Sequence, residues 1–360
     1  MGPEILATRP LTEAVWTQAQ QDLALARREL AAAPAGVYRQ SRYDRMLAAE
    51  RHATGLVHAW LGAALTLQPV RNPRMVLSLD VDGVLEDESH GFSSTGMPGA
   101  AALKLLQLGG VAVLLNTARS MDEVRARSEH FHLLGGVSAF GATIWDAVFD
   151  REQNLLSPGA EEQLASLRST LRADSEVVID SLHDASLRVS RVRDGVPGPI
   201  VGTDARRLLD RLELKHLTFW VAPRYTDFVD RGVDKAVGVE RLRAALGLGS
   251  LPLAAMGDAS CDVPMLRLAR HAFLPAATLP SYVAPRGQRL VRARHLGDQS
   301  VWEAACQLVP DASLQREVVT LVEHVDFPPW LPEELCRAPA NGKGFFPRIA
   351  AALTSIRRTD

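Results

Sequence analysis

The sequence has 360 residues, of which 47% are hydrophobic and 23% are charged, and its formal net charge is -2. These proportions are those of a soluble globular protein, and the length predicts two or three structural units around one large core. Nearly balanced charge excludes the broad basic surface with which many proteins bind nucleic acid or anionic membranes. We therefore expect neither as a partner.

The cysteines and the apolar stretches indicate the cellular compartment in which the protein is expected. The three cysteines, Cys261, Cys306 and Cys336, are odd in number and lack metal-ligand spacing, which favours a reduced, cytoplasmic compartment. The first residues lack the basic and apolar segments of a signal peptide. The most apolar stretch, residues 55–67, is too short to cross a bilayer, so we expect a buried helix there.

Residues 1–70 are predicted to form a helical extension. Apolar residues recur at helical spacing within residues 11–33 and again within residues 41–67. Proline and glycine at 34–36 break the pattern, so we expect an antiparallel helical hairpin. The hairpin carries no catalytic motif. It is predicted to be a packing appendage or a contact within a homo-oligomer.

Residues 71–147 are predicted to begin an α/β core. Residues 75–80 and 111–115 are typical of buried strands. Around them we expect a Gly- and Ser-rich loop at 88–96, a helix at 100–108 and a helix at 120–134 that a capping box opens. Alternating helices and continuously apolar strands indicate a doubly wound parallel sheet of the Rossmann-like kind. In such sheets ligands bind beyond the carboxyl ends of the strands.

Residues 148–231 interrupt this rhythm and are predicted to be an inserted α+β cap domain. We expect helices from 157 and at 203–214, and strands at 177–180, 187–192 and 216–221. The core resumes over residues 232–310, with a helix at 234–246 and strands at 251–256 and 271–274. The tail, residues 311–360, is predicted to be partly helical. It holds a helix at 312–324, a proline-rich turn at 327–330 and a final short helix.

Two acids follow the first predicted core strand. Asp80 and Asp82 flank Val81 and precede Gly83, which allows close approach of the backbone. The Asp80 carboxylate can attack a phosphoryl group to give an aspartyl-phosphate, and it can also hold a hard cation. Asp82 can protonate the leaving alkoxide and later activate water. Taken alone, the pair is equally well interpreted as an acidic turn.

Three further motifs carry candidate groups at strand ends or helix starts. Thr117 and the amides after it can contact phosphate, and Arg119 can add a charge-assisted bond to substrate. Lys235 can offset the repulsion between a carboxylate and a phosphate. Asp258 can ligate magnesium, and Asp262 can orient Lys235 or hold a metal-bound water. Taken singly, Thr117 can be interpreted as an ordinary loop residue, Lys235 as a solvated lysine, and the pair of Asp258 and Asp262 as a helix cap.

The four motifs together are more specific than any one of them. Their order along the chain is acid pair, hydroxyl, lysine and acid pair. The sequence resembles the haloacid dehalogenase superfamily of phosphohydrolases, in the Cof-like branch, whose large α/β cap lies between the second and third motifs. The resemblance covers roughly residues 75–308. It rests on Asp80-Val-Asp-Gly-Val, Asn116-Thr-Ala-Arg-Ser, Phe140-Gly-Ala-Thr-Ile-Trp-Asp, Gly232-Val-Asp-Lys and Gly257-Asp-Ala-Ser-Cys-Asp.

This resemblance implies a role for each matched residue. Asp80 would be the nucleophile and a Mg²⁺ ligand. Asp82 would be the general acid/base, with its backbone carbonyl as a second ligand, and Asp258 would complete the metal site. Thr117 and Lys235 would hold the phosphate. The cap would close over the site and select the substrate.

The sequence departs from the branch at three positions. Ala118, which with Arg119 would lie against the substrate, stands where the branch usually has glycine. Phe140 and Cys261 each replace a frequent asparagine. The change at Cys261 removes an amide that can contact phosphate or order the metal loop. Cys261 and Asp262 are expected to act behind the metal ligands.

Several other polar groups are candidate sites. His130 and His132 are two residues apart on a predicted helix, so they point to different faces and cannot chelate one metal together. Arg188, Arg191 and Arg193 lie on or beside a cap strand. There they are predicted to be exposed strand charges, with an anion-binding role as the alternative.

Two further patterns have ordinary structural explanations. Thr218 and Trp220 share one face of a predicted cap strand, and core packing of Trp220 is preferred over stacking on a substrate. The glycine pairs at 109–110 and 135–136 are predicted to be turns. The sequence contains neither the dinucleotide fingerprint nor the nucleotide-binding loop.

The sequence therefore predicts a magnesium-dependent phosphatase, a phosphoric monoester hydrolase that acts on a small phosphomonoester such as a sugar phosphate. A phosphomutase shares this fold and nucleophile, and only the large cap favours hydrolysis, through the resemblance. A non-catalytic binding protein is a third alternative. The intact Asp80, Asp82, Lys235 and Asp258 argue against it.

Overall fold

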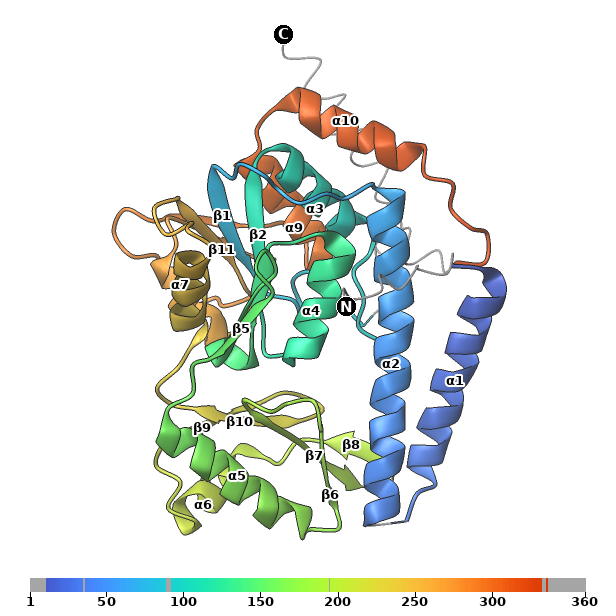
Figure 1. Ribbon diagram of the computed structural model, residues 1–360, viewed down its shortest axis with the longest axis vertical. Helices are drawn as coiled ribbons and strands as arrows, with labels where there is room; N and C mark the ends of the chain where they lie inside the picture. The colour runs from blue at the N-terminus through green and yellow to red at the C-terminus, as the bar shows by residue number, and fades with distance from the viewer. Residues whose placement is uncertain (1–10, 35, 89–91, 194, 332–334, 336–360) are drawn as a thin grey trace.

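The computed structural model describes residues 11–34, 36–88, 92–193, 195–331 and 335. A larger α/β unit and a smaller one lie one above the other, and a helical hairpin runs alongside both (Figure 1). Three predictions fall outside the described residues: the absence of a leader at the N-terminus, the thiol of Cys336 and the final short helix. No helix within the described ranges is long and apolar enough to cross a membrane.

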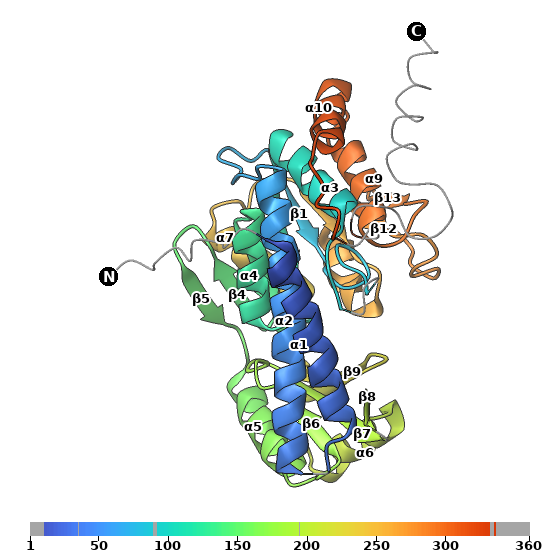
Figure 2. The same ribbon diagram turned by 90° about the vertical axis from the view of Figure 1, so that its right-hand side faces the viewer.

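The hairpin consists of α1 (Glu13–Ala31) and α2 (Val37–Ala64), which run antiparallel, as the apolar spacing predicted (Figure 2). Thr12 caps α1 because its side-chain oxygen accepts the Val15 N–H at 3.3 Å. The buried residues of α1 recur at helical spacing, and they are Trp16, Ala19, Leu23, Ala26 and Leu30. α2 has 28 residues, which makes it long enough to reach both α/β units.

The larger sheet has eight strands in the order β13-β12-β11-β1-β2-β3-β4-β5. Their bounds are β1 (Met75–Leu79), β2 (Val111–Asn116), β3 (Gly135–Ser138), β4 (Thr143–Asp146), β5 (Arg151–Asn154), β11 (Leu253–Met256), β12 (His271–Leu274) and β13 (Arg289–Arg292). The strands from β13 to β3 pair in parallel, whereas β4 pairs antiparallel with β3 and β5. The predicted parallel sheet is confirmed, with an antiparallel edge added to it.

This antiparallel edge corrects two predictions. Gly135 and Gly136, predicted as a turn, lie in β3. A Cβ on Gly136 would stand 2.5 Å from a methyl carbon of Val124, so the absent side chain lets α4 (Met121–Phe131) pack on the strand. The cap was predicted to start at residue 148, yet β5 lies after that point and belongs to the larger sheet. The chain leaves this sheet only after Asn154.

Helices cover both faces of the larger sheet. α3 (Met97–Leu108) and α9 (Gly297–Leu308) pack together on one face and share a core with β1 and β2. α7 (Lys235–Ala245) and α8 (Val263–Leu268) cover the opposite face, whose core includes Val76 of β1. Successive residues of β1 therefore enter different cores, as the pleat of a strand requires. The doubly wound arrangement is confirmed.

The smaller unit is an antiparallel sheet with helices on one face. Its elements are α5 (Pro158–Arg172), β6 (Val177–Ile179), β7 (Leu187–Arg193), β8 (Val196–Gly198), α6 (Gly202–Arg211), β9 (Leu217–Val221) and β10 (Thr226–Asp230). The strand order is β6-β7-β10-β9, and β8 pairs with β7. α5 and α6 share a core with one face of this sheet. The prediction of an inserted α+β cap is confirmed.

Within the described residues, the chain after β13 forms α9 and α10 (Ala312–Glu323). α9 was not predicted, whereas α10 matches the helix expected at 312–324. α10 packs on α3, at the end of the larger unit that is distant from the smaller one (Figure 1).

Candidate active site

The register of the larger sheet brings three motifs to one edge. Leu79, the last residue of β1, pairs with Leu115 of β2 and with Met256 of β11. Because all three strands are parallel, the residues that follow them emerge at the same edge. Asp80, Thr117 and Asp258 are therefore neighbours, although they are far apart in sequence.

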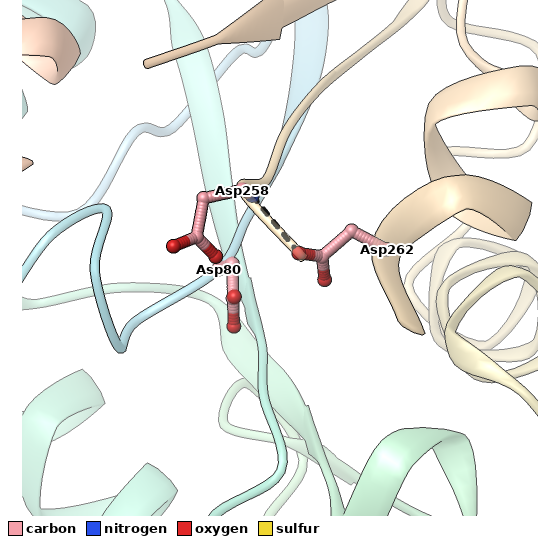
Figure 3. A group of neighbouring side chains, drawn as sticks. All are labelled: Asp80, Asp258 and Asp262. Atoms are coloured by element: carbon pink, nitrogen blue, oxygen red, sulfur yellow. Dashed lines mark hydrogen bonds between the residues drawn. The ribbon is translucent and has the colours of Figure 1, made fainter. Parts of the chain in front are cut away.

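Three carboxylates converge at this edge. Each of Asp80, Asp258 and Asp262 offers a ligand oxygen, and these atoms lie within 4.8 Å of one another (Figure 3). Asp262 is fixed by its surroundings, since its Oδ2 accepts the backbone N–H groups of Asp258 at 3.0 Å and Ala259 at 2.9 Å. The loop after β11 therefore holds one acid rigidly behind the other two.

Lys235 is the cation of the cluster. It is the first residue of α7, and its side chain is only 1% exposed. Its Nζ donates to Asp80 Oδ1 at 2.8 Å and to Asp262 Oδ1 at 2.5 Å. Burial alone would lower the pKa of Lys235, but Asp262 and Asp80 raise it well above its ordinary value. The ammonium is therefore charged and points at the predicted nucleophile.

The charges of this cluster fit a divalent cation. Three carboxylates face one ammonium, so the ionised cluster carries an excess of two negative charges. Burial and the neighbouring Asp262 raise the pKa of Asp258 to about 6, and the same two causes raise the pKa of Asp80. Carboxylate oxygens are the ligands that Mg²⁺ prefers. The donor set therefore fits Mg²⁺, and bound cation would relieve the crowding.

Gly83 is required by the approach of two loops. Its φ is +75°, a conformation that side chains with a Cβ rarely adopt. A Cβ at this position would lie 2.3 Å from Asp258 Oδ2. The glycine after Asp82 therefore lets the first motif lie directly against the acid of the fourth.

Asp82 is held by Arg119. Arg119 donates from Nη2 to Asp82 Oδ1 at 2.5 Å and from Nε to Asp82 Oδ2 at 3.2 Å. The same guanidinium also donates to Glu123 at 2.9 Å and to Ser93 Oγ at 2.8 Å. Four of its five N–H groups are thus engaged. In this arrangement Arg119 positions Asp82, whereas the sequence predicted that it would contact substrate.

A buried ionic network behind Asp82 was not predicted. Glu86 is fully buried and accepts two hydrogen bonds from Arg127, at 2.6 and 2.9 Å. Although burial alone would raise the pKa of Glu86, Arg127 and Arg119 hold it well below its ordinary value. Burial lowers the pKa of the adjacent His58 to about 3, so this imidazole is neutral. The i,i+4 spacings of Arg119 with Glu123 and of Glu123 with Arg127 were local signals of the network.

The loop of the second motif is buried and meets the cap. Thr117 is fully buried, and its Oγ1 accepts the backbone N–H of Arg119 at 3.3 Å. The backbone oxygen of Ala118 accepts a hydrogen bond at 3.3 Å from Arg188 of β7 in the cap. The cap therefore contacts the predicted phosphate-binding loop directly.

Arg188 and Trp220 correct two sequence-based interpretations. Arg188 was expected to be exposed, but it is 7% exposed and forms two hydrogen bonds with Asp227, at 2.8 and 2.9 Å. Its guanidinium also lies 3.8 Å from the ring centroid of Tyr225. Trp220 was expected in a core, but it is 36% exposed and stacks on Phe140 with ring centroids 6.4 Å apart. The alternation of polar and apolar residues predicted strands at both positions, but it did not show which face of the cap sheet is covered.

The remaining candidates are placed as follows. Cys261 lies in the turn before α8, and burial raises the pKa of its thiol, so it is an uncharged neighbour of Asp262. Arg191 forms an ion pair with Asp174 at 3.2 Å, and Arg193 is exposed. His132 ends α4 in the left-handed conformation.

Two of the cavities that border the larger unit differ in their distance from the predicted acid/base. A cleft of about 1310 Å³ lies between α2, α4 and α5, and none of the predicted site residues lines it. A smaller cavity of about 100 Å³ is lined by Asp82 and Arg119 on one side and by Arg188 and Tyr225 of the cap on the other. The smaller cavity is therefore the one adjacent to the predicted acid/base.

Comparisons with known proteins agree with this arrangement. The family model for haloacid dehalogenase-like hydrolases matches residues 204–274, which include Lys235, Asp258 and Asp262. A protein from Thermoplasma acidophilum has a similar fold, with a TM-score of 0.52 and 16% identity over 66% of this chain and 99% of that one. A haloacid dehalogenase-like hydrolase from Bacteroides thetaiotaomicron has a TM-score of 0.50 and 14% identity over 66% of this chain and 100% of that one. A search of curated proteins gave no match.

At these identities the two structures show the fold alone, and the family match covers the third and fourth motifs. The first and second motifs meet them at the same edge of the sheet. The predicted resemblance is therefore confirmed for the fold and for the third and fourth motifs, and the cap of this chain lies between the second and third motifs.

Proposed function

We propose that the chain is a magnesium-dependent phosphatase that hydrolyses a small phosphomonoester through an aspartyl-phosphate on Asp80. The observation that carries this proposal is the cluster of Asp80, Asp258 and Asp262 around the buried Lys235. An acid at a strand end, a buried ammonium beside it and a cation site of hard oxygen ligands are what phosphoryl transfer needs.

The metal would be held by the carboxylates of Asp80 and Asp258. Asp262 has one oxygen on Lys235 and the other on two backbone amides, so its part is to orient the other groups. When bound, Mg²⁺ would neutralise charge on the phosphoryl oxygens. Lys235 would add a second positive charge on the side of Asp80.

In the first step, one oxygen of Asp80 forms a bond to phosphorus while the bond from phosphorus to the leaving oxygen breaks. Asp82 gives its proton to that oxygen, so the leaving group departs as an alcohol. Water then attacks phosphorus, and Asp82 takes the proton from it. The bond from Asp80 to phosphorus breaks, which releases inorganic phosphate and restores Asp80.

The proposal is tested by measuring phosphate release from a panel of phosphomonoesters with Mg²⁺ and with a chelator. We expect Mg²⁺-dependent release that falls by at least about 10³-fold in Asp80→Asn, because the amide is not a nucleophile. Asp150→Asn is the matched control, since that side chain is 78% exposed. Equal activity of wild type and Asp80→Asn would contradict the proposal.

A further inference from the structure

The hairpin helix α2 contacts both the cap and the core. On the cap side, Gln40 exchanges two hydrogen bonds with the backbone of Ile179 in β6, at 2.7 and 2.8 Å. On the core side, the Thr54 hydroxyl donates to the backbone oxygen of Ser93 at 2.8 Å. One continuous helix therefore fixes the position of the cap relative to the loop that follows Asp82 (Figure 1).

Arg51 strengthens this connection near the centre of α2. Its Nη2 donates to both carboxylate oxygens of Asp180, at 2.9 and 2.8 Å, and the Asp180 side chain is only 3% exposed. Its Nε lies 4.0 Å from Glu123, which also binds Arg119. The hairpin is thus joined to the residue that positions Asp82.

The same helix forms a wall of the small cavity beside Asp82. Its lining residues are Tyr43, Leu47, Glu50, Arg51 and Thr54. Their spacing places them on one face of the helix. The loops of the larger unit and the strands of the cap form the remaining walls. In the proposed mechanism Asp82 protonates the leaving oxygen, so the leaving group must extend into the cavity that Asp82 lines.

With every acidic and basic side chain ionised, the cavity walls carry no net charge. Its basic lining residues are Arg51, Arg119, Arg127, Arg188 and Arg224. Its acidic lining residues are Glu50, Asp82, Glu88, Glu123 and Asp180. Arg224 from the cap, for example, pairs with Glu50 of α2 at 3.4 Å and with Glu88 at 3.2 Å. Walls of this kind offer both donors and acceptors, which suits hydroxyl groups better than a second anion.

The cavity is also small. A cavity of roughly 150 Å³ holds one benzene molecule, so about 100 Å³ accommodates roughly four to five non-hydrogen atoms. We propose that α2 is a fixed wall of the leaving-group pocket, which limits the enzyme to phosphomonoesters with a small, uncharged, hydroxyl-bearing leaving group. This inference rests on the proposed phosphatase function and names its substrate class. It also gives the N-terminal hairpin a part in specificity.

The test varies Leu47, the aliphatic side chain that α2 contributes to the cavity. The probes are glycerol 3-phosphate, glucose 6-phosphate, which has a larger neutral leaving group, and 3-phosphoglycerate, which has a charged one. For the wild type we expect kcat/KM for glycerol 3-phosphate to exceed the other two by about tenfold or more. In Leu47→Ala the ratio of kcat/KM for glucose 6-phosphate to that for glycerol 3-phosphate should rise about tenfold, because the smaller side chain leaves more room in the cavity.

Leu47→Phe provides the opposite change and guards against a folding defect in the alanine variant. It should weaken use of glycerol 3-phosphate about tenfold through KM. Arg45→Ala is the matched control on the same helix, since Arg45 pairs with Glu29 within the hairpin and does not line the cavity. Its selectivity should equal that of the wild type.

The outcomes separate this inference from the proposed function. Binding of the same esters to Asp80→Asn with Mg²⁺, measured by calorimetry, reports selectivity without turnover. If the esters bind but the wild type hydrolyses none of them, the phosphatase proposal fails. The ratio of the affinities for these esters in the Leu47 variants then still tests whether α2 limits the size of the leaving group. Unchanged selectivity in both folded Leu47 variants, or a wild-type preference for 3-phosphoglycerate, would overturn the inference.

Discussion

Asp82 and Arg119 show how a single side chain fixes the proposed acid/base. Both carboxylate oxygens of Asp82 are bound to Arg119, whose remaining contacts reach Glu123 and Ser93. The planar guanidinium makes these contacts in a fixed fork that an ammonium cannot reproduce. The orientation of Asp82 is therefore set by α4 and by the loop at Ser93 together.

Arg119→Lys should lower kcat by about tenfold or more while KM changes little, because the charge remains but the two-point hold on Asp82 is lost. Steady-state kinetics across a pH series measures whether the loss falls on kcat or on KM. The same series shows whether the pH profile is displaced. Arg125→Lys, on α4 shortly after Arg119, is the control, because Arg125 pairs with exposed Asp150 and Glu152 and such pairs contribute little. A drop in Tm with unchanged kcat would show that Arg119 acts on stability alone.

The sequence placed the motif residues well because strand register determines where they emerge. Asp80, Thr117 and Asp258 follow parallel strands, so their meeting follows from the order of the strands. The contact between Glu86 and Arg127 could not be predicted, because the two are separated by 41 residues and belong to a loop and a helix. The burial of Arg188 depends on Asp227 and Tyr225, which lie on and beside a strand that the sequence did not reveal.

Between elements, a side chain of α9 caps another helix. α3 begins after Gly96, which has no side chain to accept its free N–H groups. The Asp298 carboxylate accepts the N–H of Gly96 at 3.0 Å and that of Gly99 at 3.3 Å. Burial, followed by the neighbouring Asp87, raises the pKa of Asp298 to about 7. Folding therefore favours the protonated form of this acid.

This raised pKa predicts a pH-dependent effect of Asp298→Asn. Between pH about 4 and 7 the folded chain keeps a proton that the unfolded chain loses, so wild-type stability falls across this window. The amide still accepts the two N–H groups but carries no charge. The variant should therefore gain in Tm relative to wild type as the pH rises from 4 to 8, by the equivalent of roughly 4 kcal/mol at most.

Asp311 gives a control of opposite sign. It caps α10, and hydrogen bonds from Ser313 and Leu314 lower its pKa. Asp311→Asn should lose stability relative to wild type as the pH rises through the ordinary range of an aspartate. A flat difference in Tm for Asp298→Asn between pH 4 and 8 would contradict the assigned direction.

Elements were predicted well where their signals are local. The capping box of Ser120 and Glu123 is present because both partners lie within one turn of α4. β3, β4 and β5 were missed because each has four residues and β3 begins with two glycines. Pairing with neighbours, rather than propensity, makes these segments strands.

Across the whole molecule, the hairpin was expected to be an appendage or a contact between copies of the chain. Contact with other copies stays a prediction. Within the chain, the hairpin packs on the cap through a small core that includes Met46 of α2 and Val178 of β6. It also reaches the core, where the Thr95 N–H donates to His58 at 3.1 Å. These contacts make the hairpin a brace between the two units.

Loss of one contact of the brace should be visible in hydrogen exchange. In Gln40→Ala the Ile179 amide loses its acceptor on α2, so its protection should fall by about 1–3 kcal/mol, the cost of an unpaired buried donor. Hydrogen exchange read by NMR or mass spectrometry measures this change. Gln18→Ala is the control, since the side chain of Gln18 donates to Asp22 on the exposed side of α1. Unchanged protection in Gln40→Ala would show that the cap does not depend on the brace.

The brace also has a consequence for the order in which the protein is made. Gln40 and Arg51 leave the ribosome 139 and 129 residues before their partners Ile179 and Asp180. At ordinary rates of translation this interval is on the order of ten seconds. During it, the apolar face of α2 that later meets the cap stays uncovered. We therefore expect slower translation of the cap to increase aggregation of the newly made chain.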